Sequence, residues 1–139
     1  MELSTKALFA AELKELPKVI TWARAYLLQI VSDATLIKKM ELVLEEAFVN
    51  IVHHAYQGKG GIVEILFQGK AKSHLEIVFT DKGISFNPTE KIREFDPSIP
   101  LEKRKEGGLG IYLMRQMVDE MLYRRDGVCN VLTFRKKLH

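Results

Sequence analysis

Residues 45–56 read Glu-Glu-Ala-Phe-Val-Asn-Ile-Val-His-His-Ala-Tyr, and this stretch decides the fold that the sequence predicts. It lies within residues 35–57, where apolar side chains recur every three or four residues, as in an amphipathic helix. Glu46, Asn50 and His54 follow one another at four-residue spacing, which places them in one row beside the apolar stripe. Such a row can line a pocket at the edge of the core, or it can be an ordinary polar helix flank.

Outward from this helix, the sequence pattern predicts an α+β fold. The order of elements favours a two-layer helix-over-sheet sandwich, with helices on one face of a mainly antiparallel mixed sheet. The Asp126-Gly127 pair is a strong signal for a two-residue turn between the last two strands. The expected elements are strands over residues 2–9, 62–68, 74–80, 121–125 and 128–136, and helices over residues 17–31, 35–57 and from residue 109 onward.

The composition is that of one globular domain spanning residues 1–139. Hydrophobic residues make up 47% of the chain and charged residues 28%, which excludes intrinsic disorder and collagen-like repeats. No apolar stretch approaches the roughly 20 residues of a membrane span, and the N-terminus does not resemble a secretory signal. The single cysteine, Cys129, has no internal disulfide partner, and its apolar neighbours predict a buried thiol. These features predict a cytoplasmic protein without a membrane anchor.

The charge balance is slightly basic, with a formal net charge of +3 and an isoelectric point of about 9.0. A basic protein can bind nucleic acid, and that alternative rests on the isoelectric point alone. The basic residues are interleaved with glutamates, as in residues 102–106, and no aromatic and basic platform for stacking bases is evident. The pattern therefore favours a solvated surface of mixed charge and no direct contact with nucleic acid.

The row that begins at Glu46 carries the residue types of a catalytic site. A carboxylate beside the core has its pKa raised by desolvation, which suits it to act as a general base. One turn further on, the amide oxygen of Asn50 is a hard ligand suited to Mg²⁺, which usually also binds water and phosphate oxygens. The adjacent His53 and His54 lack the partners of a zinc site.

Asp81-Lys82-Gly83 directly follows a predicted strand. An aspartate at a strand end, with a glycine that allows close approach to the backbone, can accept a hydrogen bond from an amino-bearing heterocycle. The same three residues can also form a plain turn.

Gly107-Gly108-Leu109-Gly110 opens the third predicted helix after an irregular stretch rich in charge and proline. Glycines ahead of a helix leave its free N–H groups accessible, and the helix dipole favours phosphate there. This arrangement predicts a nucleotide lid over about residues 87–107, or alternatively a flexible loop before an ordinary helix. The sequence has no Walker A motif and no protein-kinase glycine-rich loop, so any ATP site has another architecture.

In this order and spacing, residues 45–56, 81–88 and 107–120 resemble the three boxes of the Bergerat-type (GHKL) ATPase superfamily, which includes gyrase and the histidine kinases. Within it, the chain is most similar to the small anti-sigma factor serine/threonine-protein kinases. The likeness extends from about residue 9 to the C-terminus. It implies that ATP binds between the helix over residues 35–57 and the sheet.

The resemblance also implies a role for each matching residue. Glu46 would be the catalytic base that accepts the proton of a substrate serine. Asn50 would hold Mg²⁺, and Asp81 would accept a hydrogen bond from the adenine amino group. The full set implied to bind ATP comprises Asn50, His54, Asp81, Gly83, Lys105, Gly107, Gly108, Leu109 and Gly110.

At the level of function, the resemblance implies an ATP-dependent kinase that phosphorylates a serine of a STAS-domain anti-anti-sigma partner. Such proteins also sequester a sigma factor and usually form homodimers. The alternative is an ATP-binding anti-sigma or adaptor module without appreciable kinase activity. Two features depart from the pattern: Ser85 stands where the wider superfamily has a further glycine, and none of Lys103, Arg104 and Lys105 aligns with a γ-phosphate contact.

Overall fold

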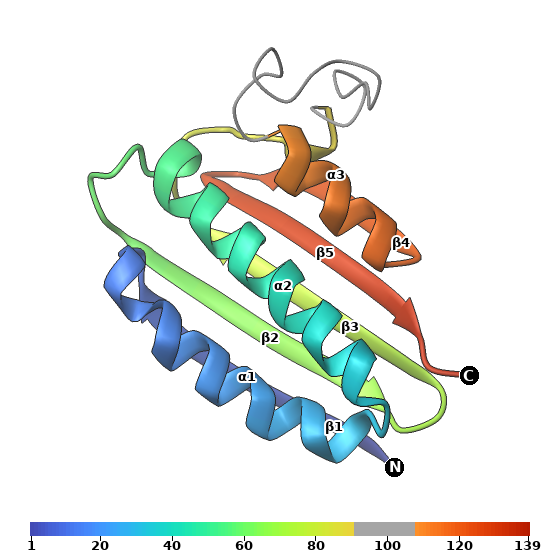
Figure 1. Cartoon of the computed structure of the whole chain (residues 1–139). Helices are drawn as coiled ribbons and strands as arrows, with labels where there is room; N and C mark the ends of the chain where they lie inside the picture. The colour runs from blue at the N-terminus through green and yellow to red at the C-terminus, as the bar shows by residue number, and fades with distance from the viewer. Residues whose placement is uncertain (91–107) are drawn as a thin grey trace.

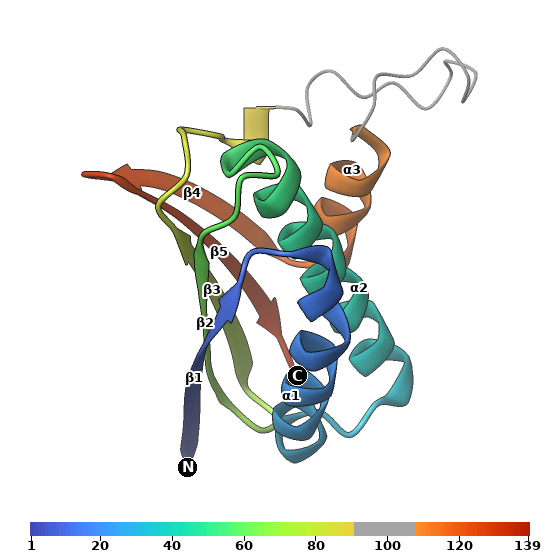
Figure 2. The same cartoon turned by 90° about the vertical axis from the view of Figure 1, so that its left-hand side faces the viewer.

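The computed structural model describes residues 1–90 and 108–139, which form a sheet with helices on one face (Figure 1). Viewed along the sheet, the helices and the strands form two separate layers (Figure 2). The strand order is β1-β2-β3-β5-β4, so β1 and β4 are the edges. The strands are β1 (Glu2–Ala10), β2 (Ile62–Lys70), β3 (His74–Asp81), β4 (Glu120–Asp126) and β5 (Cys129–Lys137), and the helices are α1 (Leu16–Ile30), α2 (Ala34–Asn50) and α3 (Gly108–Met117). The α+β sandwich predicted from the sequence is confirmed.

The expectation of a mixed sheet is wrong, because every strand pair that the structure describes is antiparallel. The connections explain this result. The two helices α1 and α2 lie between β1 and β2, so the chain returns to the end of the sheet at which β1 finished. Similarly, α3 and β4 together bring the chain back before β5 runs down beside β3 (Figure 1). A parallel pair would need a crossover through one helix.

Local sequence explains where the helices begin. Pro17 occupies the first turn of α1, where its missing N–H removes no helical hydrogen bond. Asp33 caps α2, since its side chain accepts a hydrogen bond of 2.9 Å from the backbone N–H of Thr35.

The helix predicted over residues 35–57 is not uniform. After Asn50 it widens into a π-helical turn, η2 (Ile51–Ala55), in which the Tyr56 N–H donates to the Ile51 carbonyl at 3.0 Å. The apolar pattern of the sequence is the same for an α- and a π-turn, so it could not reveal the change. Such turns occur frequently at functional sites.

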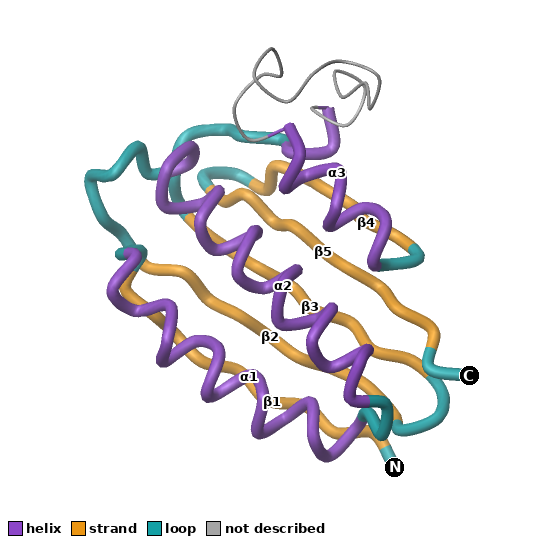
Figure 3. The backbone as a smooth tube through the Cα atoms, in the orientation of Figure 1, coloured by secondary structure: helices purple, strands orange, loops and turns teal. Residues whose placement is uncertain are grey.

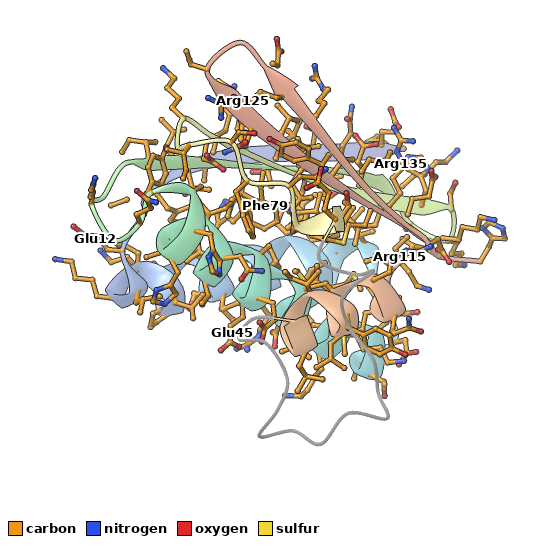
Figure 4. All side chains as sticks on the ribbon, turned by 90° about the horizontal axis from the view of Figure 1, so that it is seen from above. Glu12, Glu45, Phe79, Arg115, Arg125 and Arg135 are labelled. Carbon is orange, nitrogen blue, oxygen red and sulfur yellow. The ribbon has the colours of Figure 1, made fainter. Side chains whose placement is uncertain are left out.

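The core lies between the helices and the inner face of the sheet. Alternate residues of β2 and β3 are buried, as the period of two predicts. The Tyr26 ring of α1 stacks on Phe67 of β2 with a centroid distance of 4.7 Å. Phe79 of β3 lies in the same layer, between the sheet and α2, whereas Glu45 points away from the sheet (Figure 4). Apolar side chains on the inner face of β2 and β3 therefore anchor the middle of the sheet on the helices.

The β4–β5 hairpin corrects two expectations. Asp126 pairs with Cys129, so the two loop residues are Gly127 and Val128 rather than Asp126 and Gly127. Gly127 has φ +60°, and a glycine with positive φ at the first loop position is typical of a type II′ turn. Cys129 is half-buried rather than buried, because it stands beside this exposed turn.

In the part of the chain that the structure describes, no helix has the length and apolar character needed to cross a membrane.

Candidate functional site

The three sequence segments singled out above meet at one end of the sheet, which we call the cleft end. There α2 finishes, the chain leaves β3 at Asp81, and α3 begins (Figure 3). A small cavity at this end has Asn50, Asp81 and Asn130 among its lining residues, together with Phe86 and Tyr123. Its volume of about 20 Å³ is room for roughly one water molecule.

Asn50 lies on the last turn of α2 and is 8% exposed. Its Nδ2 atom is buried and has no hydrogen-bond partner among the described residues. An unpartnered buried amide is unfavourable by about 1–3 kcal/mol. Native proteins usually satisfy such a group with protein, ordered water or a ligand. Asn50 Nδ2 is therefore a donor available to water or to a ligand group at the cavity that Asn50 lines.

Glu46, one turn before Asn50, lies against the first turn of α3. A Cβ atom built on Gly110 would lie 2.3 Å from the Glu46 Oε2 atom, so glycine is the residue that lets α3 approach this carboxylate. Burial raises the pKa of the Glu46 carboxyl above its usual value, and the charge of Glu45 raises it further. A half-buried carboxyl with a raised pKa is suited to accept a proton near neutral pH.

Asp81 ends β3 and is 3% exposed. Its Oδ1 atom accepts hydrogen bonds from the Gly83 N–H and from Asn130 Nδ2, both at 2.8 Å. Burial raises the pKa of Asp81 above its ordinary value, while these two hydrogen bonds and the charge of Arg125 act in the opposite direction. The aspartate at the strand end thus forms an Asx turn with Gly83 and is also a buried acceptor held by Asn130.

Gly83 packs directly on the π-helical turn. A Cβ atom at this position would lie 2.4 Å from the Ala55 carbonyl oxygen and 2.7 Å from the Ala55 Cβ atom. The same carbonyl accepts a hydrogen bond of 2.8 Å from the Ile84 N–H. The requirement for glycine is therefore one of space, which keeps the loop after β3 pressed against the end of α2.

The remaining predicted site residues lie on η2, at the start of α3 or outside the described residues. The His54 ring belongs to the π-helical turn and stacks on Phe86, with a centroid distance of 4.7 Å and an interplanar angle of 18°. Gly108 is the first residue of α3, and Leu109 in its first turn is partly exposed. Lys105 and Gly107 lie outside the described residues, as does most of the lid predicted over residues 87–107.

Sequence reasoning missed two residues that shape this site. Asn130 contacts Asp81 across the sheet, although 49 positions separate them in the chain. The Tyr56 hydroxyl donates to the Ile62 carbonyl at 2.7 Å and accepts from the Lys82 N–H at 2.8 Å. It thereby ties the loop after β3 to the start of β2. Tyr56 stood within the quoted stretch 45–56, but spacing alone assigned it no role.

The donor set bears on which metal the site could hold. Among residues 1–90 and 108–139, no three His, Cys, Asp or Glu side chains gather closely enough to hold a metal ion. Mg²⁺ does not require such a cage, because it binds through one or two oxygen ligands, water and substrate phosphates. Mg²⁺ binds oxygen atoms, so Oδ1 is the atom of Asn50 that could act as a ligand, while the unpartnered Nδ2 atom can only donate a hydrogen bond, as to water or a phosphate oxygen.

Comparison with known proteins defines the class to which this fold and site belong. Residues 9–136 match the family described as "Histidine kinase-like ATPase domain", and the chain belongs to this family. The resemblance to Bergerat-type ATPases drawn from the three sequence segments is thereby confirmed.

The similarity to individual proteins is more specific than the match to the family. The chain is 37% identical over 99 residues to "Serine-protein kinase RsbW" of Bacillus thuringiensis (strain Al Hakam). The same identity holds for the proteins of that name from Bacillus cereus (strain AH820) and Bacillus anthracis (strain CDC 684 / NRRL 3495). Each alignment covers 69% of this chain and 61% of the relative, so the chain spans less than two thirds of the length of these kinases.

Proposed function

We propose that this protein is an ATP-dependent serine protein kinase that also acts as an anti-sigma factor. The observation that carries the proposal is the convergence of Glu46, Asn50 and the start of α3 at the cleft end. It places a carboxyl of raised pKa, a buried amide and a glycine-marked helix N-terminus side by side. Phosphoryl transfer requires mainly positioning and charge neutralisation; Glu46 and Asn50 would position the reacting groups, and the N-terminus of α3 favours the phosphate charge. The similarity to proteins named serine-protein kinase supports the same reaction.

In this proposal, residues 1–139 act as one ATP-binding domain, and each residue of the site has a defined task. Asp81 accepts the amino group of adenine, and Gly83 lets the base lie against the backbone. Gly108 and Gly110 approach the phosphates from the start of α3, where free N–H groups and the helix dipole favour negative charge. His54, Leu109, Lys105 and Gly107 complete the set proposed to contact ATP.

Glu46 accepts the proton of the substrate serine hydroxyl. As it does so, the serine oxygen forms a bond to the γ-phosphorus and the bond from that phosphorus to the ADP oxygen breaks. Asn50 Oδ1 would hold Mg²⁺, which neutralises phosphate charge when bound. The raised pKa of Glu46 suits this task because it brings the base closer to neutral pH.

The partners proposed for the chain follow from its likeness to the anti-sigma kinases. The phosphorylated protein would be a STAS-domain anti-anti-sigma factor, and the sequestered protein a sigma factor, in a cytoplasmic partner-switching module. We also propose that the chain acts as a homodimer. These assignments concern the whole regulatory cycle and rest on the family likeness rather than on any single contact.

The decisive experiment is transfer of labelled γ-phosphate from ATP to a serine of a cognate STAS-domain protein. Glu46→Gln should retain ATP binding by calorimetry and lower the transfer rate by about 100-fold or more, because the proton acceptor is lost. Glu45→Gln is the matched control, since Glu45 is the exposed neighbour that points away from the sheet (Figure 4). It should leave transfer within about twofold of the wild-type rate and shift its pH profile slightly toward lower pH, because the Glu45 charge adds to the raised pKa of Glu46.

The outcomes separate the candidate functions. Wild-type protein that binds ATP and a sigma factor without transferring phosphate would identify an ATP-binding anti-sigma or adaptor module instead. Unchanged transfer in Glu46→Gln would refute the role of that carboxylate. Absence of Mg²⁺-dependent ATP binding by the wild-type protein would overturn the proposal altogether.

A further inference from the structure

Among the residues that the structure describes, Asn130 of β5 has the most hydrogen-bonded side chain at the cleft end. It is 3% exposed and directly opposite Asp81 in the β3–β5 pair. Its Nδ2 atom donates at 2.8 Å to two acceptors, Asp81 Oδ1 and the Ile84 carbonyl. A buried amide that uses both of its donor hydrogens in this way is fixed in position.

The other end of the same amide is equally constrained. Asn130 Oδ1 accepts from the Tyr123 hydroxyl, from the Phe86 N–H at 3.3 Å and from Arg125 Nη1 at 3.2 Å. Only donors approach Oδ1 and only acceptors approach Nδ2, so the network permits one orientation of the amide. Arg125 lies near the tip of the hairpin and also donates to the Gly83 carbonyl at 2.8 Å (Figure 4).

This arrangement determines which atom of Asp81 remains for a ligand. Both donors that Asp81 meets among the described residues, Asn130 Nδ2 and the Gly83 N–H, end on Oδ1. The second oxygen, Oδ2, therefore keeps its acceptor capacity, and the two hydrogen bonds to Oδ1 hold the plane of the carboxylate. Asp81 and Asn130 line the same cavity, so the free acceptor and its support belong to one recess.

We propose that Asn130 is the positioning residue for base recognition: by holding Asp81 Oδ1, it presents Oδ2 as a fixed acceptor for the exocyclic amino group of the purine. The inference rests on the proposed ATP site and deepens it, because it assigns the preference for a 6-amino purine to a pair of residues. Asp81 touches the base, and Asn130 acts through Asp81. Tyr123 and Arg125 hold Asn130 in turn.

The test compares ATP with purine riboside triphosphate, which lacks only the 6-amino group, by calorimetry in the presence of Mg²⁺. The wild-type protein should bind ATP about tenfold or more tightly than the analogue, because a hydrogen bond to a charged acceptor is absent with the latter. Asn130→Asp keeps the size and the acceptor side of the amide and replaces the donor to Asp81 with an oxygen. In this variant the ratio of the two affinities should fall to about threefold or less.

Two further variants make the result decisive. Asn130→Leu removes the donor without adding a charge, and it provides the same test if two adjacent buried carboxyls prevent Asn130→Asp from folding. Gln68→Glu adds a negative charge on the exposed side of β2 and should preserve the wild-type ratio. Thermal melting establishes that each variant is folded before its affinities are compared.

A merely structural role for Asn130 would weaken both nucleotides by the same factor, and that result overturns the inference, as does an unchanged ratio. Wild-type protein that binds neither nucleotide would overturn the proposed function and this inference together. Wild-type protein that binds ATP selectively, with a ratio insensitive to Asn130, would leave the proposed function standing and refute the inference alone.

Discussion

Two hydrogen-bonded side-chain pairs join β3 directly to β5. Their hydrogen-bond distances are similar, but the pairs differ in burial. At the cleft end, Asn130 donates to Asp81 at 2.8 Å, and both residues are 3% exposed. Toward the opposite end, Arg135 donates to Glu76 at 2.9 Å, but the Arg135 side chain is about half exposed. The comparison shows that a hydrogen-bond distance alone does not indicate how much a pair contributes to stability. Loss of one partner leaves a buried group unsatisfied in the first pair and a hydrated group in the second.

The ionisation of carboxyl groups shows the same contrast between the ends. Burial raises the pKa of Glu46 and of Asp81 at the cleft end. At the opposite end, a hydrogen bond from the Lys137 N–H and the nearby lysine charges lower the pKa of Asp119. Folding therefore opposes ionisation at the cleft end and favours it at the other. A cluster of carboxyl groups whose ionised form the fold disfavours is typical of a functional site.

The largest effect is expected from Gly83→Ala, which breaks the cleft end sterically. The new Cβ atom would lie 2.4 Å from the Ala55 carbonyl oxygen, a backbone atom that can move only with the π-helical turn. We expect a loss of about 3 kcal/mol in the free energy of unfolding, measured by chemical denaturation, and loss of ATP binding.

Gly69→Ala is the matched control at the opposite end, where the added Cβ atom would lie 2.8 Å from the His74 carbonyl oxygen. It should destabilise the protein by a smaller amount, about 1–2 kcal/mol, and leave the affinity of the folded protein for ATP unchanged. Equal losses of ATP affinity in both variants would show that binding depends on the stability of the whole fold and not on the cleft end in particular.

Asp81→Asn sharpens the comparison, because it should separate stability from binding. The amide oxygen can still accept from Gly83 and Asn130, while the charge that burial disfavours is removed. ATP affinity should fall by about tenfold to 100-fold, since the charged acceptor proposed for the adenine amino group is lost. The melting temperature at pH 8 should equal or exceed that of the wild-type protein.

The pH dependence gives this prediction a definite sign. The folded-state pKa of Asp81 is raised, so the folded wild-type protein binds a proton more tightly than the unfolded chain. The contribution of Asp81 to wild-type stability therefore rises as the pH falls from its folded pKa toward the unfolded value of about 3.9. Because the amide that replaces this carboxyl in Asp81→Asn does not titrate, the difference in melting temperature should shrink over that range. A difference that grows as the pH falls would contradict the assigned environment of Asp81.

Much of the fold could be predicted from local pattern. Alternation along residues 62–68 and 74–80 identified β2 and β3 within two residues, because one face of each strand is buried and the other is not. The cap at Asp33 and the first-turn Pro17 located the helices for equally local reasons. Glu46, Asp81 and Gly110 were recognisable as candidate site residues because each belongs to a short motif, and the structure brings all three to the cleft end.

What local pattern could not supply was register and helix geometry. Asn130 follows the β4–β5 turn at a position that no local spacing marks. Its contact with Asp81 becomes evident only when β5 pairs with β3, which places the two residues opposite each other. Likewise, the four-residue row from Glu46 assumed a regular helix, whereas the turn after Asn50 is wider and brings His54 onto Phe86. Both features depend on contacts between residues far apart in the chain, which one sequence does not encode in any local spacing.

The smallest effect is expected from Arg135→Ala, which breaks the exposed pair. Arg135 bonds to Glu76 and lies 3.8 Å from Glu120, but all three side chains are accessible to water. Hydration replaces most of the lost attraction, and the backbone carbonyl of Arg135 still accepts from the Asp119 N–H at 2.9 Å. The melting temperature should stay within about 2 °C of the wild-type value, with ATP affinity unchanged and little dependence on salt. A loss of about 1–3 kcal/mol, the cost of leaving a buried group unsatisfied, would mean that the exposed pair stabilises the sheet as strongly as the buried one. In that case the cleft end would differ from the rest of the molecule in what it is proposed to bind, and not in how strongly its side-chain pairs stabilise the fold.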